Sequence, residues 1–91
     1  GQLMRIPIPS LNEERRNELK KMIKNLGEKC KISIRNIRRE AKDDLKQMLR
    51  DKKISEDENI RHEKEVQIIT DQEIKKVDEK VLQKEKEIMK V

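Results

Sequence analysis

KKISEDE, residues 52–58, is the stretch that decides the fold, because two long helical patterns meet there. Glu58 follows Ser55 by three positions, which is the spacing of a capping box, where each side chain satisfies a backbone N–H of the other residue. A helix is therefore predicted to begin just after Ser55. The earlier helix must end first, so a turn over about residues 53–55 is expected to reverse the chain.

The segment before this turn is predicted to be one helix over about residues 12–52. Asn12 or Ser10 can cap it, and no proline interrupts it. At 1.5 Å per residue such a helix is on the order of 60 Å long. Its apolar or small residues recur at spacings of three and four and form one stripe, which another element must cover. The stripe consists of Leu19, Ile23, Leu26, Cys30, Ile34, Ile37, Ala41, Leu45 and Met48.

The segment after the turn is predicted to be a second helix over about residues 56–90, with apolar residues on two arcs. One arc can pack against the first helix, whereas the other requires a further neighbour. We therefore predict an all-α fold, a long antiparallel helical hairpin that supplies two helices of a three-helix bundle. The first arc contains Val66, Ile69, Ile74, Val77, Val81 and Ile88, and the second contains Ile60, Ile68, Leu82 and Met89.

Composition supports extended helices and leaves little material for a core. The 91 residues are 47% charged and 32% hydrophobic, and they include no aromatic residue. A single cysteine cannot form an internal disulfide, so the chain suits a reducing compartment such as cytoplasm or an organelle matrix. No apolar run approaches the roughly 20 residues of a membrane span. Residues 1–11, with Pro7 and Pro9, are expected to be extended and do not resemble a signal peptide.

Positive charge is concentrated in the first helical segment. Residues 12–53 contain fifteen Lys or Arg against eight Asp or Glu, whereas residues 54–91 contain eight against eleven. On a helical wheel, Arg35, Arg38 and Lys42 share a face roughly 120° from the centre of the apolar stripe, so we expect them on the outer side of the helix. With their neighbours they form the basic row: Lys24, Lys31, Arg35, Arg38, Arg39 and Lys42, with Lys20 and Lys46 close to it.

The basic row has two interpretations. Lys and Arg on the wet face of a long helix are commonly just solvated, which would leave a generic coiled-coil interaction module without RNA binding. However, acids such as Glu40 and Asp43 lie on another side of this helix, and a row of one sign suits phosphate contact. Without aromatic residues to stack on bases, contact with the backbone and shape of folded RNA is the expected mode.

The sequence gives no support for catalysis or metal binding. It has no glycine-rich phosphate loop and no serine–histidine pair, so we expect neither an enzyme nor a cofactor. His62 is the only histidine, with Glu58 and Glu65 at helical spacing, and a metal site would need more ligands. Cys30 lies on the apolar stripe and is interpreted as a small packing residue.

Four blocks of the sequence resemble, in the same order and with matching spacing, the C-terminal portion of ribosome recycling factors. The resemblance covers essentially the whole chain. It implies the last two helices of a three-helix bundle, with the family's N-terminal helix as the third neighbour, and it makes the segment at Arg5 to Pro9 a hinge that leaves an inserted β-rich domain. The blocks are RIPIPSLNEERRNEL (5–19), IRNIRREAKDDL (34–45), KKISEDE (52–58) and EVQIITDQEIKKVDEKVLQKEKEIMKV (65–91).

The resemblance also implies a function. Family members bind the ribosome after termination and, with elongation factor G, separate its subunits, while the bundle contacts large-subunit ribosomal RNA. The arginines of the family's Arg-Asn-Ile-Arg-Arg motif fall at Arg35, Arg38 and Arg39, which become the expected phosphate-binding residues. Four positions depart from the family pattern. Gly27 stands where alanine is common, and Lys42 replaces a usual asparagine. Asp44 takes a usually basic position, and Glu73 stands where an aromatic residue or alanine is common. The implied partner is RNA, with no DNA and no membrane.

The uncovered apolar residues lead to one further expectation. If no third helix is present, the second arc and the uncovered edge of the first helix's stripe should lie side by side and drive self-association. A symmetric pair of hairpins that makes a four-helix arrangement is the simplest closed solution.

Overall fold

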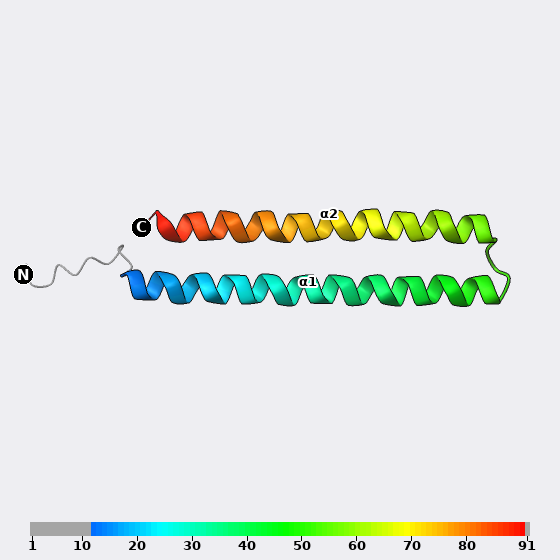
Figure 1. Ribbon diagram of the computed structural model, residues 1–91, viewed down its shortest axis with the longest axis horizontal. Helices are drawn as coiled ribbons and strands as arrows, with labels where there is room; N and C mark the ends of the chain where they lie inside the picture. Colours follow the sequence, from blue (N-terminus) through cyan, green and yellow to red (C-terminus); the bar gives the residue numbers. More distant parts are fainter. Residues whose placement is uncertain (1–11, 91) are drawn as a thin grey trace, which may run out of the picture.

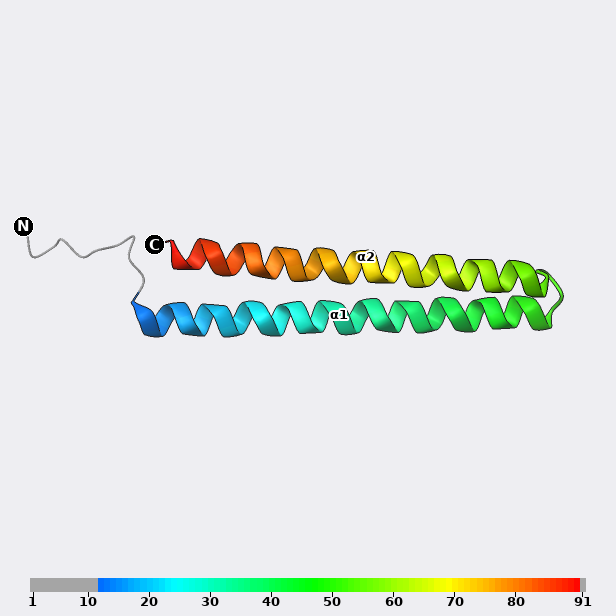
Figure 2. The ribbon, with the colours of Figure 1, turned by 45° about the horizontal axis from the view of Figure 1, so that its top comes forward.

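The computed structural model describes residues 12–90, which form two long helices. Helix α1 spans Glu13–Arg50 and helix α2 spans Glu56–Met89. The helices lie side by side and antiparallel, so the start of α1 and the end of α2 are at the same end of the hairpin (Figures 1 and 2). The predicted all-α hairpin is confirmed, whereas a third helix stays a prediction. The expected extended segment over residues 1–11 lies outside the described residues.

Both helices begin with the side-chain caps that their sequences specify. The Asn12 side chain accepts a hydrogen bond from the backbone N–H of Arg15 (2.7 Å). At the start of α2 the capping box is complete: Ser55 Oγ accepts from the N–H of Glu58, and Glu58 Oε1 accepts from the N–H of Ser55, both at 3.1 Å. The Ser55 N–H holds the pKa of Glu58 below its ordinary value of 4.5. This contribution to stability is therefore present above pH 4.5 and is lost as pH falls through the lowered pKa.

Helix α1 ends two residues before the predicted limit, in a Schellman motif that uses lysine where glycine is usual. The N–H of Lys52 donates to the carbonyl of Leu49 (3.0 Å), and the N–H of Lys53 donates to that of Met48 (2.8 Å). Lys52 has φ of 60°, and no other residue of the described range has a positive φ. A lysine in this left-handed conformation costs free energy, because its Cβ crowds the following carbonyl.

We predict that Lys52→Gly stabilises the hairpin. Glycine adopts the left-handed conformation without the Cβ conflict, so the free energy of unfolding should rise by about 1 kcal/mol. Urea unfolding followed by circular dichroism measures the change. Lys53→Gly is the control, because it removes the same charge at a residue that does not have a positive φ. It should lower the free energy of unfolding. Equal effects of the two substitutions would contradict the proposed strain at Lys52.

The line along which the helices touch, here called the seam, passes through Gly27 and Thr70, the only buried residues among those described. A Cβ placed on Gly27 would lie 2.7 Å from Val81 Cγ2, so glycine allows the two helices to approach closely there. Thr70 is 5% exposed, and its hydroxyl donates to the Val66 carbonyl (2.7 Å). In the described part of the chain no hydrophobic side chain is fully buried, because two helices alone cannot enclose a core. Neither of them carries an apolar stretch long enough to cross a membrane.

The seam does not follow the centre of the apolar stripe of α1. Ile23, Ile34 and Leu45 on the seam are half-buried, but the stripe residues Leu26 and Ile37 are exposed, together with Cys30 and Met48. Helix α2 therefore covers one edge of the stripe and leaves the other edge open. As a result, a groove runs along each side of the seam, and the two grooves differ in chemistry.

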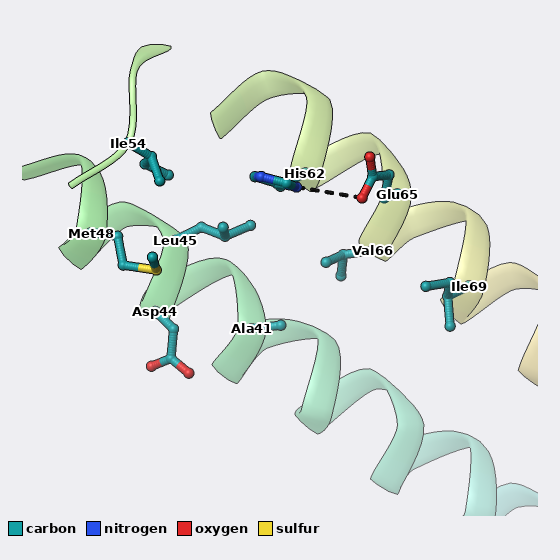
Figure 3. A pocket seen from close by; sticks show the side chains of 9 residues that line it. All are labelled: Ala41, Asp44, Leu45, Met48, Ile54, His62, Glu65, Val66 and Ile69. Atoms are coloured by element: carbon teal, nitrogen blue, oxygen red, sulfur yellow. Dashed lines mark hydrogen bonds and ion pairs between the residues drawn. The ribbon is translucent and has the colours of Figure 1, made fainter. Parts of the chain in front are cut away.

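The apolar groove is the one beside the open edge of the stripe. Its α1 side includes Leu26 and Cys30, and its α2 side includes Ile69 and Lys80. Figure 3 shows its turn-proximal part, where apolar side chains from both helices point into the space between them. The other groove lies across the seam and is here called the basic groove, because the basic row of α1 lies along it. It is lined by Lys24, Glu28 and Lys31 from α1 and by Asp78, Leu82 and Glu85 from α2.

This arrangement corrects one expectation about the exposed residues of α2. Ile60, Ile68, Leu82 and Met89 are exposed, as predicted for the second arc. However, Leu82 lines the basic groove, and at about 100° per residue Ile60 and Met89 point to the same side of α2. The second arc and the open edge of the stripe therefore lie on opposite sides of the seam, and the prediction that they lie side by side is wrong.

We predict that Gly27→Ala destabilises the hairpin although alanine favours helix by about 1 kcal/mol. The new methyl group would meet the branched Val81 side chain, and such overpacking costs about 1–3 kcal/mol. Asn25→Ala, at an exposed position of the same helix, should instead raise the free energy of unfolding. Combining Gly27→Ala with Val81→Ala removes the conflict. Urea unfolding of the original chain, the two single variants and the double variant should therefore show that the double variant is more stable than the two single effects added together predict. A Gly27→Ala hairpin more stable than the original would refute the close approach.

Candidate nucleic-acid interface

The basic row lies closer to the seam than its sequence pattern indicated. Taking Gly27 as the point on α1 that faces α2, Arg38 is turned only about 20° away from it, and Arg35 and Lys42 about 60–80°. All three side chains are half-buried, whereas Lys24 and Arg39 are exposed. The prediction of an outer position is therefore wrong for Arg35, Arg38 and Lys42. They lie along the basic groove because α2 packs on the stripe edge nearest to them.

Lys31 has a specific structural partner that the sequence interpretation missed. Its Nζ lies 2.8 Å from Asp78 Oδ1 on α2 and 3.1 Å from Glu28 Oε1 on α1, and its side chain is 17% exposed. The hydrogen bond to Asp78, followed by that to Glu28, raises the pKa of Lys31 above its ordinary value of 10.5. Lys31 thus joins the two helices, and its charge is already balanced within the hairpin.

The sequence contained a signal for this pair. In an antiparallel hairpin, residues at equal distances from the turn lie level with each other, and Lys31 and Asp78 are nearly equidistant from Ile54. The alignment of the two helices that the turn imposes therefore places a lysine opposite an aspartate. The sequence alone could thus have identified Lys31 as a link between the helices.

The arginines of the motif remain available to an external anion. None of the ion pairs found among residues 12–90 involves Arg35, Arg38, Arg39 or Lys42. Arg39 Nη1 donates to Asn36 Oδ1 (3.2 Å), which leaves its other N–H groups to bind elsewhere. Guanidinium groups present several N–H donors in a fixed plane and bind phosphate oxygens in pairs. Three such groups within residues 35–39 can therefore contact neighbouring phosphates of one nucleic-acid backbone.

Side chains of α2 limit the interface to the α1 side of the basic groove. Asp78 and Glu85 line this groove, and Asp71 accepts a hydrogen bond from Gln67 (2.9 Å) on the same helix. Carboxylates on the α2 rim repel phosphate, so an approaching anion would be directed toward α1. Lys46, exposed and close to Lys42 on this face, extends the positive surface toward the turn.

Other polar residues do not form a second site within the described chain. His62 Nδ1 lies 3.4 Å from Glu65 Oε2 at the turn end of the apolar groove (Figure 3). Across residues 12–90 no three His, Cys, Asp or Glu side chains converge closely enough to hold a metal ion. Cys30 is exposed on the apolar groove rather than packed in the seam.

Comparison with known proteins identifies the family. The family model described as ribosome recycling factor matches residues 1–89. The chain belongs to the ribosome recycling factor family. A ribosome-recycling factor from Natranaerobius thermophilus is 52% identical over 88 residues, which are 97% of this chain and 48% of that protein. One from Bordetella pertussis is 46% identical over 91 residues, which are 100% of this chain and 49% of that protein.

The match confirms the resemblance inferred from the four sequence blocks. The chain spans about half the length of these curated relatives. The motif RNIRR, residues 35–39, therefore lies within a helix of a recycling-factor chain, with its arginines outside the ion pairs of the described hairpin and beside the basic groove.

We predict that Lys31 and Asp78 are energetically coupled. In a double-mutant cycle, Lys31→Gln and Asp78→Asn should together destabilise less than the two single changes added, whereas Lys24→Gln and Asp78→Asn should be additive. Because the folded pKa of Lys31 is raised, the coupling is present at neutral pH and up to pH 10.5, and it is lost as pH rises through the raised value. Unfolding in urea at several pH values and salt concentrations measures it. Additivity for both pairs would exclude the link between helices.

Proposed function

We propose that this chain supplies two helices of the bundle of a ribosome recycling factor, and that Arg35, Arg38 and Arg39 bind phosphates of large-subunit ribosomal RNA. The observation that carries the proposal is the family match over residues 1–89, within which the RNIRR arginines take part in none of the ion pairs of the described hairpin. Lys42 and Lys24 add positive charge beside them. Lys31 is a weaker candidate than the sequence suggested, because Asp78 already neutralises it.

The mode of binding follows from the residues on this surface. The whole chain lacks Phe, Trp and Tyr, so it has no aromatic rings on which unpaired bases could stack. Guanidinium and ammonium groups in a line along a rigid helix instead suit the regularly spaced phosphates of folded RNA. Such contacts release counterions, so binding should weaken steeply with salt.

The rest of the recycling reaction is also part of the proposal. Because the chain spans about half the length of its relatives, we assign ribosome binding, cooperation with elongation factor G and separation of subunits to the complete factor. Within that factor the present helices would act by binding and not by catalysis. We propose bacterial cytoplasm or an organelle matrix as its location, which suits a ribosomal partner. Family membership favours this function over the generic coiled-coil module.

We predict that Arg35→Glu with Arg38→Glu weakens binding of the chain to large ribosomal subunits. Loss of two phosphate contacts should reduce the log–log dependence of affinity on salt by about 2. Cosedimentation or fluorescence anisotropy over a salt series measures both quantities. The matched control is Lys29→Glu with Arg61→Glu, which changes the net charge equally at two exposed positions turned away from the seam.

Unaltered affinity of the double arginine variant, with helical circular dichroism intact, would remove the role assigned to the arginines. Equal losses in the test and control variants would show that only overall charge matters. A chimera tests the complete function: this chain replaces the matching half of the Bordetella pertussis relative, and subunit separation is followed with elongation factor G and GTP. Activity of the chimera that depends on Arg35 and Arg38 is the expected result, whereas an inactive, folded chimera would contradict the proposed function.

A further inference from the structure

Pairs of opposite charge, here called rungs, face each other across the basic groove at intervals of seven residues. Lys31 Nζ contacts Asp78 Oδ1 at 2.8 Å, and this contact fixes which residues of the two helices are level. Residues seven positions apart return to nearly the same face of a helix, offset by only about 20°. Moving seven residues toward the turn on both helices therefore leads to a second rung, and moving seven residues away from the turn leads to a third. In order toward the turn, the rungs are Lys24 with Glu85, Lys31 with Asp78, and Arg38 with Asp71.

The rung of Arg38 and Asp71 is open in the structure. Of the three rungs, only the middle one is closed by an ion pair among residues 12–90. Asp71 Oδ1 instead accepts a hydrogen bond from Gln67 Nε2 (2.9 Å), which lies one turn earlier on α2. Arg38 is half-buried beside the seam, whereas Asp71 is exposed. The Asp71 carboxylate is thus engaged on its own helix, and the Arg38 guanidinium keeps its donors for another acceptor.

The neighbours of the open rung differ in charge from those of the closed one. Glu28 Oε1 also contacts Lys31 Nζ (3.1 Å), so two carboxylates surround that ammonium group. Seven residues farther along α1, Arg35 occupies the place of Glu28. Arg38 therefore has a second cation beside it where Lys31 has a second carboxylate. Positive charge is in excess at this rung, which favours an external anion between Arg35 and Arg38.

We infer that Gln67 and Asp71 together control the availability of Arg38 for phosphate. Asp71 is an internal competitor, because its carboxylate oxygens can take the place of phosphate oxygens on the guanidinium group. The hydrogen bond from Gln67 Nε2 holds this carboxylate on α2 and leaves Arg38 open to RNA. Gln67 is thus a positioning residue that acts through Asp71. The inference rests on the proposed function, because the anion in question is the RNA phosphate assigned to Arg38.

Removing the hydrogen bond tests the inference without any change of net charge. Gln67→Ala should release Asp71 to Arg38 and weaken binding of the chain to large ribosomal subunits about two- to fivefold, the range that a surface ion pair can supply. The matched control is Gln83→Ala. Gln83 Nε2 donates to Glu87 Oε1 (3.5 Å) with the same spacing on the same helix, but this pair is turned away from the basic groove, so its loss should leave the affinity unchanged. Fluorescence anisotropy at one fixed salt concentration measures both variants.

Removing the competitor should have the opposite effect. Asp71→Asn should raise the affinity for large subunits more than Glu79→Gln does, which removes the same charge at an exposed position turned away from the seam. In the Asp71→Asn background, Gln67→Ala should no longer weaken binding, because no carboxylate remains to be released. A merely structural effect of Gln67→Ala would persist in that background.

Unfolding of the chain alone gives a second measurement that needs no ribosome. In the Gln67→Ala background, Arg38→Gln and Asp71→Asn should be energetically coupled, because the rung can close there. When Gln67 is present, the same two changes should be closer to additive. Urea unfolding of the two double-mutant cycles compares these couplings.

The Arg38→Gln variant separates failure of this inference from failure of the proposed function. If Arg38→Gln weakens binding but Gln67→Ala does not, the proposed function stands and the inference is wrong. If Arg38→Gln leaves binding unchanged with helical circular dichroism intact, Arg38 does not bind RNA, and the proposed function fails at this residue together with the inference. Equal losses in Gln67→Ala and Gln83→Ala would also overturn the inference, because they would show an effect unrelated to Asp71.

Discussion

Two helices that lie side by side can cover only one strip of each other, and this geometric limit governs the whole hairpin. The strip here passes through Gly27 and Thr70, where the helices approach most closely. Because it runs along one edge of the apolar stripe of α1, the remaining edge stays open and no described hydrophobic side chain is fully buried. The same placement brings the motif arginines next to the seam. The displacement of the seam from the centre of the apolar stripe therefore determines both the open packing surface and the position of the charged surface.

The two grooves differ in the kind of contact that they can make. On the basic side, Lys31 and Asp78 hold the helices together, and Arg35, Arg38 and Arg39 are left without ionic partners inside the described hairpin. On the apolar side, exposed Leu26 and Ile37 offer area for another helix. An anion and a helical partner would thus approach α1 from opposite sides and need not compete. Family membership over residues 1–89 is compatible with this division, in which the apolar side packs within a helical bundle and the basic side makes the proposed RNA contact.

Local signals in the sequence predicted the helices and the turn well. Ser55 and Glu58 specify a capping box through contacts within four residues, and the structure contains that box. The position of the basic row was predicted less well, because a helical wheel locates the centre of an apolar stripe but not which edge a single partner will cover. That choice depends on long-range details such as the missing Cβ of Gly27 against Val81. The left-handed Lys52 likewise follows no local preference, since lysine rarely adopts this conformation.

The reactivity of Cys30 can report whether the apolar groove is covered. Its thiol is exposed on the apolar groove, at a place where any packed partner would shield it from solvent. The rate at which a small alkylating reagent modifies this thiol therefore measures the fraction of time for which the groove is uncovered. Because the chain has no other cysteine, that rate can be followed without labelling or substitution, in isolation and with ribosomes present.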